Sequence, residues 1–195
     1  APTGFFELGV PARIDDGLAA CGFAQPFNIQ TEAIPVAMQG KDVCGRAKTG
    51  SGKTLAFGVP MLARITDEAE PMRPLGLVLV PTRELAVQVA EVLQPVAQHA
   101  GMQVLPVYGG ASRHHQVEEM AKGVEIVVAT PLRLIDLIKS NEVSLDDMQI
   151  VTLDEADRMA DDGFTPQVEW ILRKCTAPRQ TMLFSATLDG DVGHL

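Results

Sequence analysis

The stretch "DVCGRAKTGSGKTLAF", Asp42 to Phe57, joins an apolar run to a glycine-rich turn and then to a segment of helical period. Its middle part, Ala47 to Thr54, matches the phosphate-loop pattern G-x-x-x-x-G-K-[ST], except that alanine stands at the first position. Gly50 and Gly52 still allow a tight turn in which backbone N–H groups and the start of the following helix face an anion. The stretch predicts a strand, a phosphate-binding loop and a helix, and a plain glycine turn is the alternative.

A second stretch decides between these two interpretations. "IVTLDEAD", Ile150 to Asp157, places Asp154 and Glu155 directly after an apolar run, at the carboxyl edge of a sheet where α/β proteins bind ligands. Taken alone, the acidic residues would be read as the solvated start of a helix. Together with the glycine-rich loop they are the parts of an NTPase.

The chemistry of these residues assigns them roles. Lys53 would reach the β- and γ-phosphates. The Thr54 hydroxyl and the Asp154 carboxylate would hold Mg²⁺, an ion that prefers oxygen ligands. Glu155 would orient or deprotonate the attacking water. We therefore expect Lys53, Asp154 and Glu155 to form the catalytic group, with Thr54 and Asp154 as the metal ligands.

Short apolar runs alternate with amphipathic segments along the whole chain. Strand alternating with helix implies right-handed crossovers and a parallel sheet with helices on both faces. We predict a three-layer α/β domain, with Thr31 as the N-cap of one of its first two helices. The expected strands lie in 42–47, 75–80, 103–108, 124–130, 149–154 and 180–187, and the expected helices in 11–21, 31–39, 53–64, 84–99, 112–121, 132–139 and 166–174.

Composition limits the class of protein and the kind of partner. The chain has 195 residues, 46% of them hydrophobic, which suits one domain with a sizeable core. The net charge of −9 argues against a surface that is basic throughout, so a polyanion must meet a local patch. Since the sequence has neither a signal peptide nor a membrane-spanning run, and its three cysteines are widely spaced, we expect a cytoplasmic protein with buried free thiols and no membrane contact.

Five motifs in order carry a resemblance to a known family. They are "GFAQPFNIQ" (22–30), "AKTGSGKT" (47–54), "PTRELA" (81–86), "DEAD" (154–157) and "SAT" (185–187). The chain resembles the first RecA-like domain of the DEAD-box ATP-dependent RNA helicases. The resemblance covers nearly all of residues 1–195, with the Q motif region at 5–30. It implies a RecA-like P-loop NTPase fold. It also implies that the second RecA-like domain, which carries the arginine finger, lies outside this chain.

The resemblance implies ATP and Mg²⁺ as cofactors. Gln30 would read the adenine edge, because a side-chain amide can donate and accept at once. An upstream aromatic residue would stack on the base, and its spacing from Gln30 favours Phe5 over Phe6. The phosphate loop would contribute Thr49, Gly50, Ser51, Gly52, Lys53 and Thr54.

The resemblance also implies sequence-independent binding to the backbone of single-stranded RNA. The residues expected to contact RNA are Thr82, Arg83, Gly109, Gly110, Thr130 and Arg133. Leu132 stands where the family usually has glycine, and its side chain restricts close backbone approach. Residues expected to couple the nucleotide site to RNA are Asp157, Ser185 and Thr187, with the two hydroxyls bonding to the DEAD aspartates.

The sequence thus predicts the nucleotide-binding half of an RNA helicase, which hydrolyses ATP to open short RNA duplexes when joined to a second domain. By itself the chain is expected to be nearly inactive. Two alternatives remain open at this point. One is a P-loop enzyme that phosphorylates a small molecule, and the other is an ATP-dependent module that clamps RNA without unwinding it.

Overall fold

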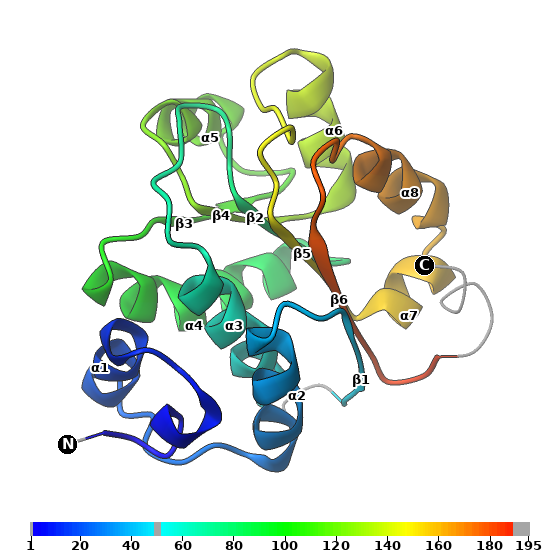
Figure 1. The fold of residues 1–195 in the computed structure, drawn as a ribbon. Helices are drawn as coiled ribbons and strands as arrows, with labels where there is room; N and C mark the ends of the chain where they lie inside the picture. Colours follow the sequence, from blue (N-terminus) through cyan, green and yellow to red (C-terminus); the bar gives the residue numbers. More distant parts are fainter. Residues whose placement is uncertain (1, 49–51, 189–195) are drawn as a thin grey trace.

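The computed structural model of the chain describes residues 2–48 and 52–188. Its centre is a six-stranded sheet in the order β1-β6-β5-β2-β4-β3, and all neighbouring strands are parallel (Figure 1). The strands are β1 (Val43–Arg46), β2 (Gly76–Leu79), β3 (Val104–Val107), β4 (Ile126–Ala129), β5 (Ile150–Asp154) and β6 (Gln180–Ser185). The predicted parallel α/β sheet is confirmed.

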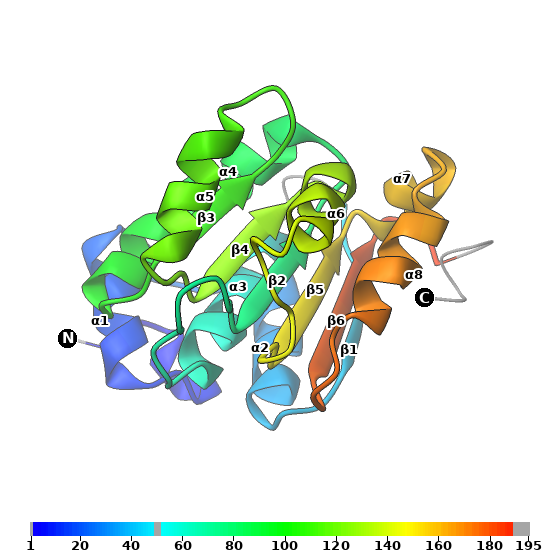
Figure 2. The same cartoon turned by 90° about the horizontal axis from the view of Figure 1, so that it is seen from above.

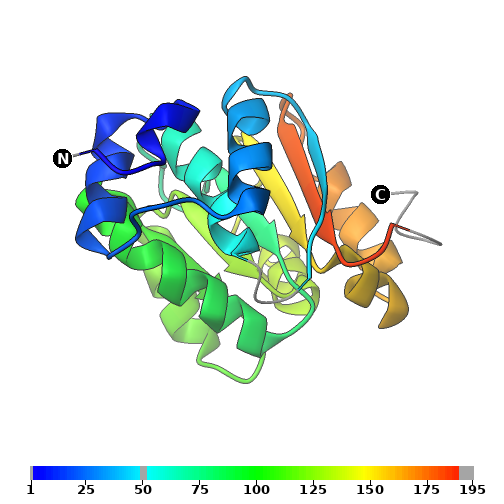
Figure 3. The same ribbon diagram turned by 90° about the horizontal axis from the view of Figure 1, so that it is seen from below.

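Helices cover both faces of this sheet. Those that precede β3 are η1 (Phe6–Leu8), α1 (Ala12–Ala20), α2 (Asn28–Met38), α3 (Lys53–Arg64) and α4 (Arg83–His99). Those that follow it are α5 (Arg113–Ala121), α6 (Pro131–Lys139), α7 (Ala156–Asp161) and α8 (Thr165–Arg173). Figure 2 views the layer formed by α5 to α8, and Figure 3 views the opposite layer, formed by α1 to α4.

Alternating strand residues divide the core between these two layers. On β2, Val78 belongs to the apolar cluster under α1–α4, whereas Leu77 and Leu79 belong to the cluster under α5–α8. Successive side chains of a strand point to opposite faces, and every β2 residue is buried. Continuous apolar runs such as "GLVL" are therefore what a sheet covered on both sides requires.

One helix start differs from the prediction by three residues, those of α1, α4, α5, α6 and α8 differ by one, and η1 and α7 were not predicted. Thr31 is not an N-cap, because α2 begins three residues earlier, at Asn28, with Phe27 as its N-cap. The Phe27 N–H donates to Oε1 of Gln30 at 2.8 Å, so a side chain inside the first turn satisfies a backbone donor that precedes the helix. In contrast, α3 occupies Lys53–Arg64, the range that was predicted.

The three cysteines are free, but their burial differs from the expectation. Cys175 is buried, Cys21 is half-buried and Cys44 is exposed. Cys44 lies on β1, an edge strand whose outer side lacks a neighbouring strand in the sheet order. Within residues 2–48 and 52–188, no helix is both long and apolar enough to cross a membrane.

The parallel arrangement brings the sequence motifs to one edge of the sheet. The phosphate loop follows β1, "PTRELA" follows β2, the glycine pair follows β3 and "TPLR" follows β4. "DEAD" begins on the last residue of β5, and "SAT" begins on the last residue of β6. Since all six strands run in the same direction, their carboxyl ends meet at the same edge.

Candidate functional site

Three charged side chains meet at the carboxyl edge of the sheet. Lys53 is the first residue of α3, Asp154 the last residue of β5, and Glu155 follows it directly. Lys53 Nζ lies 3.0 Å from Asp154 Oδ1 and 3.2 Å from Glu155 Oε2. The Lys53 side chain is 5% exposed and that of Asp154 is 0% exposed. The structure therefore brings the three predicted catalytic residues into one buried cluster.

Burial perturbs the Asp154 carboxyl group. Loss of solvent raises its pKa to about 6, although the positive charge of Lys53 acts in the opposite direction. The Asp154 carboxylate forms an ion pair with Lys53. Neither of its oxygens receives a well-directed hydrogen bond from the described residues. A buried carboxylate with unsatisfied oxygens fits a divalent cation. The half-buried Thr54, next to Lys53 on α3, supplies a hydroxyl of the type that Mg²⁺ also accepts.

The backbone of Glu155 adopts a conformation that is unusual for its residue type. Its φ of 52° and ψ of 49° are left-handed, and it is the N-cap of α7. Non-glycine residues in this region cost of order 1–3 kcal/mol and cluster at functional sites, where the surroundings hold them in place. This turn directs a 15% exposed carboxylate toward Lys53. Met72 and Asn141 also have positive φ, so the position of the Glu155 carboxylate near Lys53, rather than its backbone alone, is what suits a functional role.

The Q motif contacts the phosphate loop directly. Gln30 is only 2% exposed, and its Nε2 donates to the carbonyl oxygen of Gly52 at 2.8 Å. Gly52 has a φ of 80°, and a Cβ there would lie 2.8 Å from Gln30 Nε2 and 2.4 Å from the Phe27 ring. Only glycine fits this close approach. Thr49, Gly50 and Ser51, predicted to contact phosphate, lie outside the described residues.

Of the two phenylalanines considered for stacking on the base, the one that was predicted, Phe5, is buried, and the other, Phe6, is exposed. Phe5 is 0% exposed and belongs to the apolar core under α1–α4, so in this structure it offers no ring face to a base. The sequence predicts an aromatic ring but does not say which of two neighbouring rings points inward. Phe6 is the exposed member of the pair, at 48%.

A third phenylalanine, which the sequence analysis did not assign, lies beside the phosphate loop. Phe27 is 63% exposed and lines a surface cavity of about 590 Å³ together with Arg46, Ala47 and other residues of the β1 end and the α2 start. Its position three residues before Gln30 was visible in the sequence. Only the close approach to Gly52 shows that the ring is next to the predicted nucleotide site.

The residues predicted to contact RNA after β2 and β3 are neighbours. Thr82 is the N-cap of α4, and its hydroxyl accepts a hydrogen bond from the N–H of Leu85 at 3.2 Å. Arg83 has a 63% exposed side chain and pairs with Glu84 at 3.2 Å. A Cβ on Gly110, whose φ is 88°, would lie 2.9 Å from Arg83 Nη1. The structure therefore brings Arg83 and the glycine pair together at an exposed surface.

A hollow of about 320 Å³ joins the residues after β3 and β4. Gly109, Thr130 and Arg133 line it together with Leu132 and Phe164. Thr130 is the N-cap of α6. Leu132 is 59% exposed on the first turn of α6, so the residue that departs from the family pattern lies on this surface. Its side chain adds an apolar group where glycine would expose the backbone.

The predicted coupling residues are connected through the backbone. Ser185 is 1% exposed, and its hydroxyl accepts a hydrogen bond from the Asp157 N–H at 3.2 Å. The same hydroxyl donates to the carbonyl oxygen of Thr187. The expected bond from Ser185 to an aspartate carboxylate is therefore replaced by a bond to main chain, because the β6 end lies against the first turn of α7. Ser185 still connects the two motifs.

Comparison with known proteins shows the family of the chain. A family model for DEAD/DEAH box helicases matches residues 27–195. The chain belongs to the DEAD/DEAH box helicase family. The family membership confirms the resemblance found in the sequence, and the six-stranded parallel sheet fits the expected RecA-like domain.

Several curated relatives are similar over almost the whole chain. A pre-mRNA-processing ATP-dependent RNA helicase, PRP5 of Mycosarcoma maydis, is 47% identical over 191 residues, which cover 95% of this chain and 16% of that protein. DEAD-box ATP-dependent RNA helicase 24 of Oryza sativa is 43% identical, with 98% and 25% covered. RNA helicase CrhR of Synechocystis is 44% identical, with 98% and 38% covered. The chain thus spans well under half the length of these relatives.

Proposed function

We propose that this chain is the first RecA-like domain of an ATP-dependent RNA helicase, which binds Mg²⁺-ATP and the RNA backbone. Joined to a second RecA-like domain of the same protein, it would hydrolyse ATP to open short RNA duplexes locally. The observation that carries the proposal is the buried cluster of Lys53, Asp154 and Glu155 at the carboxyl edge of the sheet. Its free cysteines suit a reducing compartment, which fits a cytoplasmic location.

In the proposed binding step, Lys53 exchanges carboxylate partners for phosphate oxygens. Lys53 is the first residue of α3, where the helix dipole and backbone N–H groups favour an anion. Asp154 and Thr54 would hold Mg²⁺, which when bound supplies positive charge to the phosphates. Release of Lys53 would leave Glu155 free to accept a proton from water.

Base recognition is proposed for Gln30 and its surroundings. Its amide is held by the Gly52 carbonyl and the Phe27 N–H, which fixes its orientation beside the phosphate loop. Each amide group retains capacity for one further bond, since the NH₂ has two hydrogens and the oxygen two lone pairs. That capacity matches the donor and acceptor of the adenine edge, so ATP is the expected nucleotide.

RNA is proposed to bind along the exposed residues at the same edge. The exposed Arg83 offers N–H donors for phosphate oxygens, and Gly110 next to it allows close backbone approach. The Thr82 and Thr130 caps place helix starts on this surface. Contacts of this kind position a sugar-phosphate backbone and carry no base readout, so we expect sequence-independent binding of single-stranded RNA.

Steady-state ATPase activity tests the proposal. Residues 1–195 alone should show almost no RNA-stimulated turnover, because an arginine supplied from a second domain contributes about 10³ to 10⁵ in rate in comparable phosphoryl-transfer systems. The same chain joined to a second RecA-like domain should turn over ATP when single-stranded RNA is added. Comparable stimulation in both proteins would contradict the assignment of this chain as half of the catalytic unit.

Glu155→Gln in the two-domain protein separates binding from chemistry. The amide keeps the shape but cannot accept the proton, so ATP and RNA binding should persist while hydrolysis slows by about 10² or more. Unchanged hydrolysis would place the general base elsewhere. Two other results would favour the alternative functions. RNA-stimulated ATPase activity without duplex opening would favour a module that clamps RNA without unwinding it. Transfer of phosphate to a small molecule would favour a P-loop kinase.

A further inference from the structure

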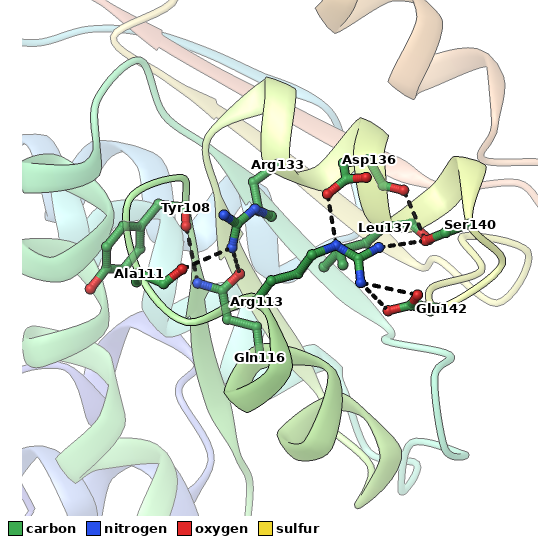
Figure 4. A network of polar contacts seen from close by, with 9 residues as sticks. All are labelled: Tyr108, Ala111, Arg113, Gln116, Arg133, Asp136, Leu137, Ser140 and Glu142. Atoms are coloured by element: carbon green, nitrogen blue, oxygen red, sulfur yellow. Dashed lines mark hydrogen bonds and ion pairs between the residues drawn. The ribbon is translucent and has the colours of Figure 1, made fainter.

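Helix α5 contacts the rest of the domain through polar as well as apolar side chains. Of its nine residues, Gln116 and Met120 are buried. It follows directly after the loop with the glycine pair, and it lies beside α6, which carries Arg133 (Figure 4). Met120 and the partly buried Val117 pack against the core under α5–α8, and polar side chains of α5 make further contacts with its neighbours.

Arg113, the first residue of α5, bridges to α6 and to the segment after it. Its Nε donates to Asp136 Oδ2 at 2.9 Å, its Nη2 to Ser140 Oγ at 2.8 Å, and its Nη1 to Glu142 Oε2 at 2.9 Å (Figure 4). The guanidinium lowers the pKa of the Asp136 carboxyl group. A planar guanidinium group that donates to three side chains fixes the orientation of α5 relative to α6 as well as the distance between them.

Gln116, one turn further along α5, makes a second connection. Its side chain is 2% exposed, and its Nε2 donates to the Tyr108 carbonyl at 3.0 Å. Its Oε1 accepts a hydrogen bond from Arg133 Nη1 at 2.9 Å, and the same Nη1 lies 3.3 Å from the Ala111 carbonyl (Figure 4). The buried amide of Gln116 therefore bonds both to the loop that carries the glycine pair and to Arg133 of "TPLR".

We propose that Gln116 and Arg113 are positioning residues for RNA binding. Gln116 orients Arg133 and the loop 108–112, and Arg113 fixes α5 against α6 so that Gln116 reaches both. This inference rests on the proposed RNA-binding function and deepens it. Both bonds of Arg133 use Nη1, and its Nε and Nη2 donate to none of the described residues. The two Nη1 bonds hold the guanidinium, and its other edge is left with N–H donors that no described residue accepts, although Asp136 lies near enough for Arg133 to lower its pKa.

The proposed benefit is pre-organisation. A free arginine side chain loses rotamer freedom when it binds phosphate, and this loss weakens binding. An arginine already held by a buried amide and a backbone carbonyl has lost that freedom on folding. Removing Gln116 should therefore weaken RNA binding even though Gln116 itself makes no contact with RNA.

The test compares RNA affinity of the parent chain with that of Gln116→Ala and Arg113→Ala. The matched control is Arg73→Ala, because Arg73 pairs with Asp147 through two hydrogen bonds, at 2.8 and 3.0 Å, near the amino ends of β2 and β5. Its side chain is 40% exposed, and that of Arg113 is 37% exposed. Binding is measured by fluorescence anisotropy of a labelled single-stranded oligouridylate at low salt.

We expect Gln116→Ala and Arg113→Ala to weaken RNA binding about 3- to 10-fold, which lies in the lower part of the range of couplings between contacting residues. Arg73→Ala should leave it unchanged. Affinity for Mg·ADP should stay at the parent value in all three variants. Because Arg113 is partly exposed, Arg113→Ala remains informative even if Gln116→Ala lowers the stability of the fold. Thermal melting measures the stability of both variants.

A double-mutant cycle distinguishes positioning from general structural damage. If Gln116 acts through Arg133, then Gln116→Ala should have little further effect in an Arg133→Ala background. Additive losses, or parent-like RNA affinity in both α5 variants, would overturn this inference while leaving RNA binding intact. A parent chain that fails to bind RNA would instead overturn the proposed function, and the inference with it.

Discussion

Two regions at the same sheet edge carry their charges in opposite environments. At the β1 and β5 ends, Lys53 and Asp154 form an ion pair with side chains 5% and 0% exposed. At the β2 end, Arg83 is 63% exposed and, among the described residues, forms its ion pair with the adjacent Glu84. In the first region, attraction between the two buried charges replaces their contact with water. In the second region, the charge of Arg83 stays in contact with water.

This difference predicts how each region responds to change. Buried pairs are strongly affected by loss of one partner and by protonation, because the remaining charge has no solvent to stabilise it. Exposed charges contribute little to stability and are screened by salt. The buried region should therefore be sensitive to pH and mutation, and the exposed region to ionic strength.

The largest expected effect is that of Lys53→Met on stability. It removes the counter-ion of buried Asp154 and should lower the free energy of unfolding by about 3–5 kcal/mol at pH 8 without magnesium. The loss should be smaller at pH 5, because the unpaired carboxyl group is then protonated. Urea denaturation at both pH values measures this. An equal loss at the two pH values would show that Asp154 is not the group left unpaired.

Protonation of Asp154 gives the next effect. Its pKa of about 6 in the folded state exceeds the ordinary value of 3.8, so between pH 4 and 6 the folded state binds more protons than the unfolded state. Its contribution to stability is therefore present at low pH and is lost as pH rises through 6, by up to about 3 kcal/mol. The difference in stability between the parent and Asp154→Asn, measured without magnesium, should show this dependence. A difference independent of pH would contradict it.

Arg83→Ala probes the exposed region. The free energy of unfolding should change by no more than about 0.5 kcal/mol, because the Arg83–Glu84 pair is solvated. RNA affinity should fall, and the slope of log affinity against log salt should become shallower by about 1, as for loss of one phosphate contact. An unchanged slope would remove Arg83 from the RNA surface.

Leu132→Gly is expected to have the smallest effect on RNA affinity. Glycine on the first turn of α6 should cost about 0.5–1 kcal/mol of stability. It should also raise RNA affinity, since the backbone next to Arg133 becomes accessible where a 59% exposed side chain now stands. Anisotropy titrations of the parent and this variant provide the comparison. A lower affinity would mean that the leucine side chain itself contacts RNA.

The sequence was sufficient wherever a local pattern determines structure. The apolar spacing of 53–64 predicted α3, and parallel strands brought Lys53 and Asp154 together because carboxyl ends of such strands share an edge. It failed at the start of α2, where Gln30 bonds the Phe27 N–H while its amide nitrogen is held by Gly52, a residue 22 positions away. No local pattern encodes that contact.

Burial and long-range polar contacts account for the other differences. Spacing from Gln30 favoured Phe5 over Phe6 as the stacking ring, but spacing does not report burial, and packing places Phe5 in the core. Gln116 carried no motif signal, yet it is buried between the Tyr108 carbonyl and Arg133. Amphipathic spacing assigns residues to a helix but does not report which polar side chain on that helix finds partners.

The cluster around Lys53 is proposed to bind the phosphates of an adenine nucleotide. Calorimetric titration of Mg·ADP into the parent and into Lys53→Met tests it most directly, with Lys122→Met as the control because Lys122 is an exposed lysine, 69% accessible, on the C-cap of α5. The parent and the control should bind equally well, and Lys53→Met should bind about 30-fold more weakly or worse, as expected for loss of a buried charged contact. Equal affinity in all three proteins would contradict the assignment of this cluster as the nucleotide site.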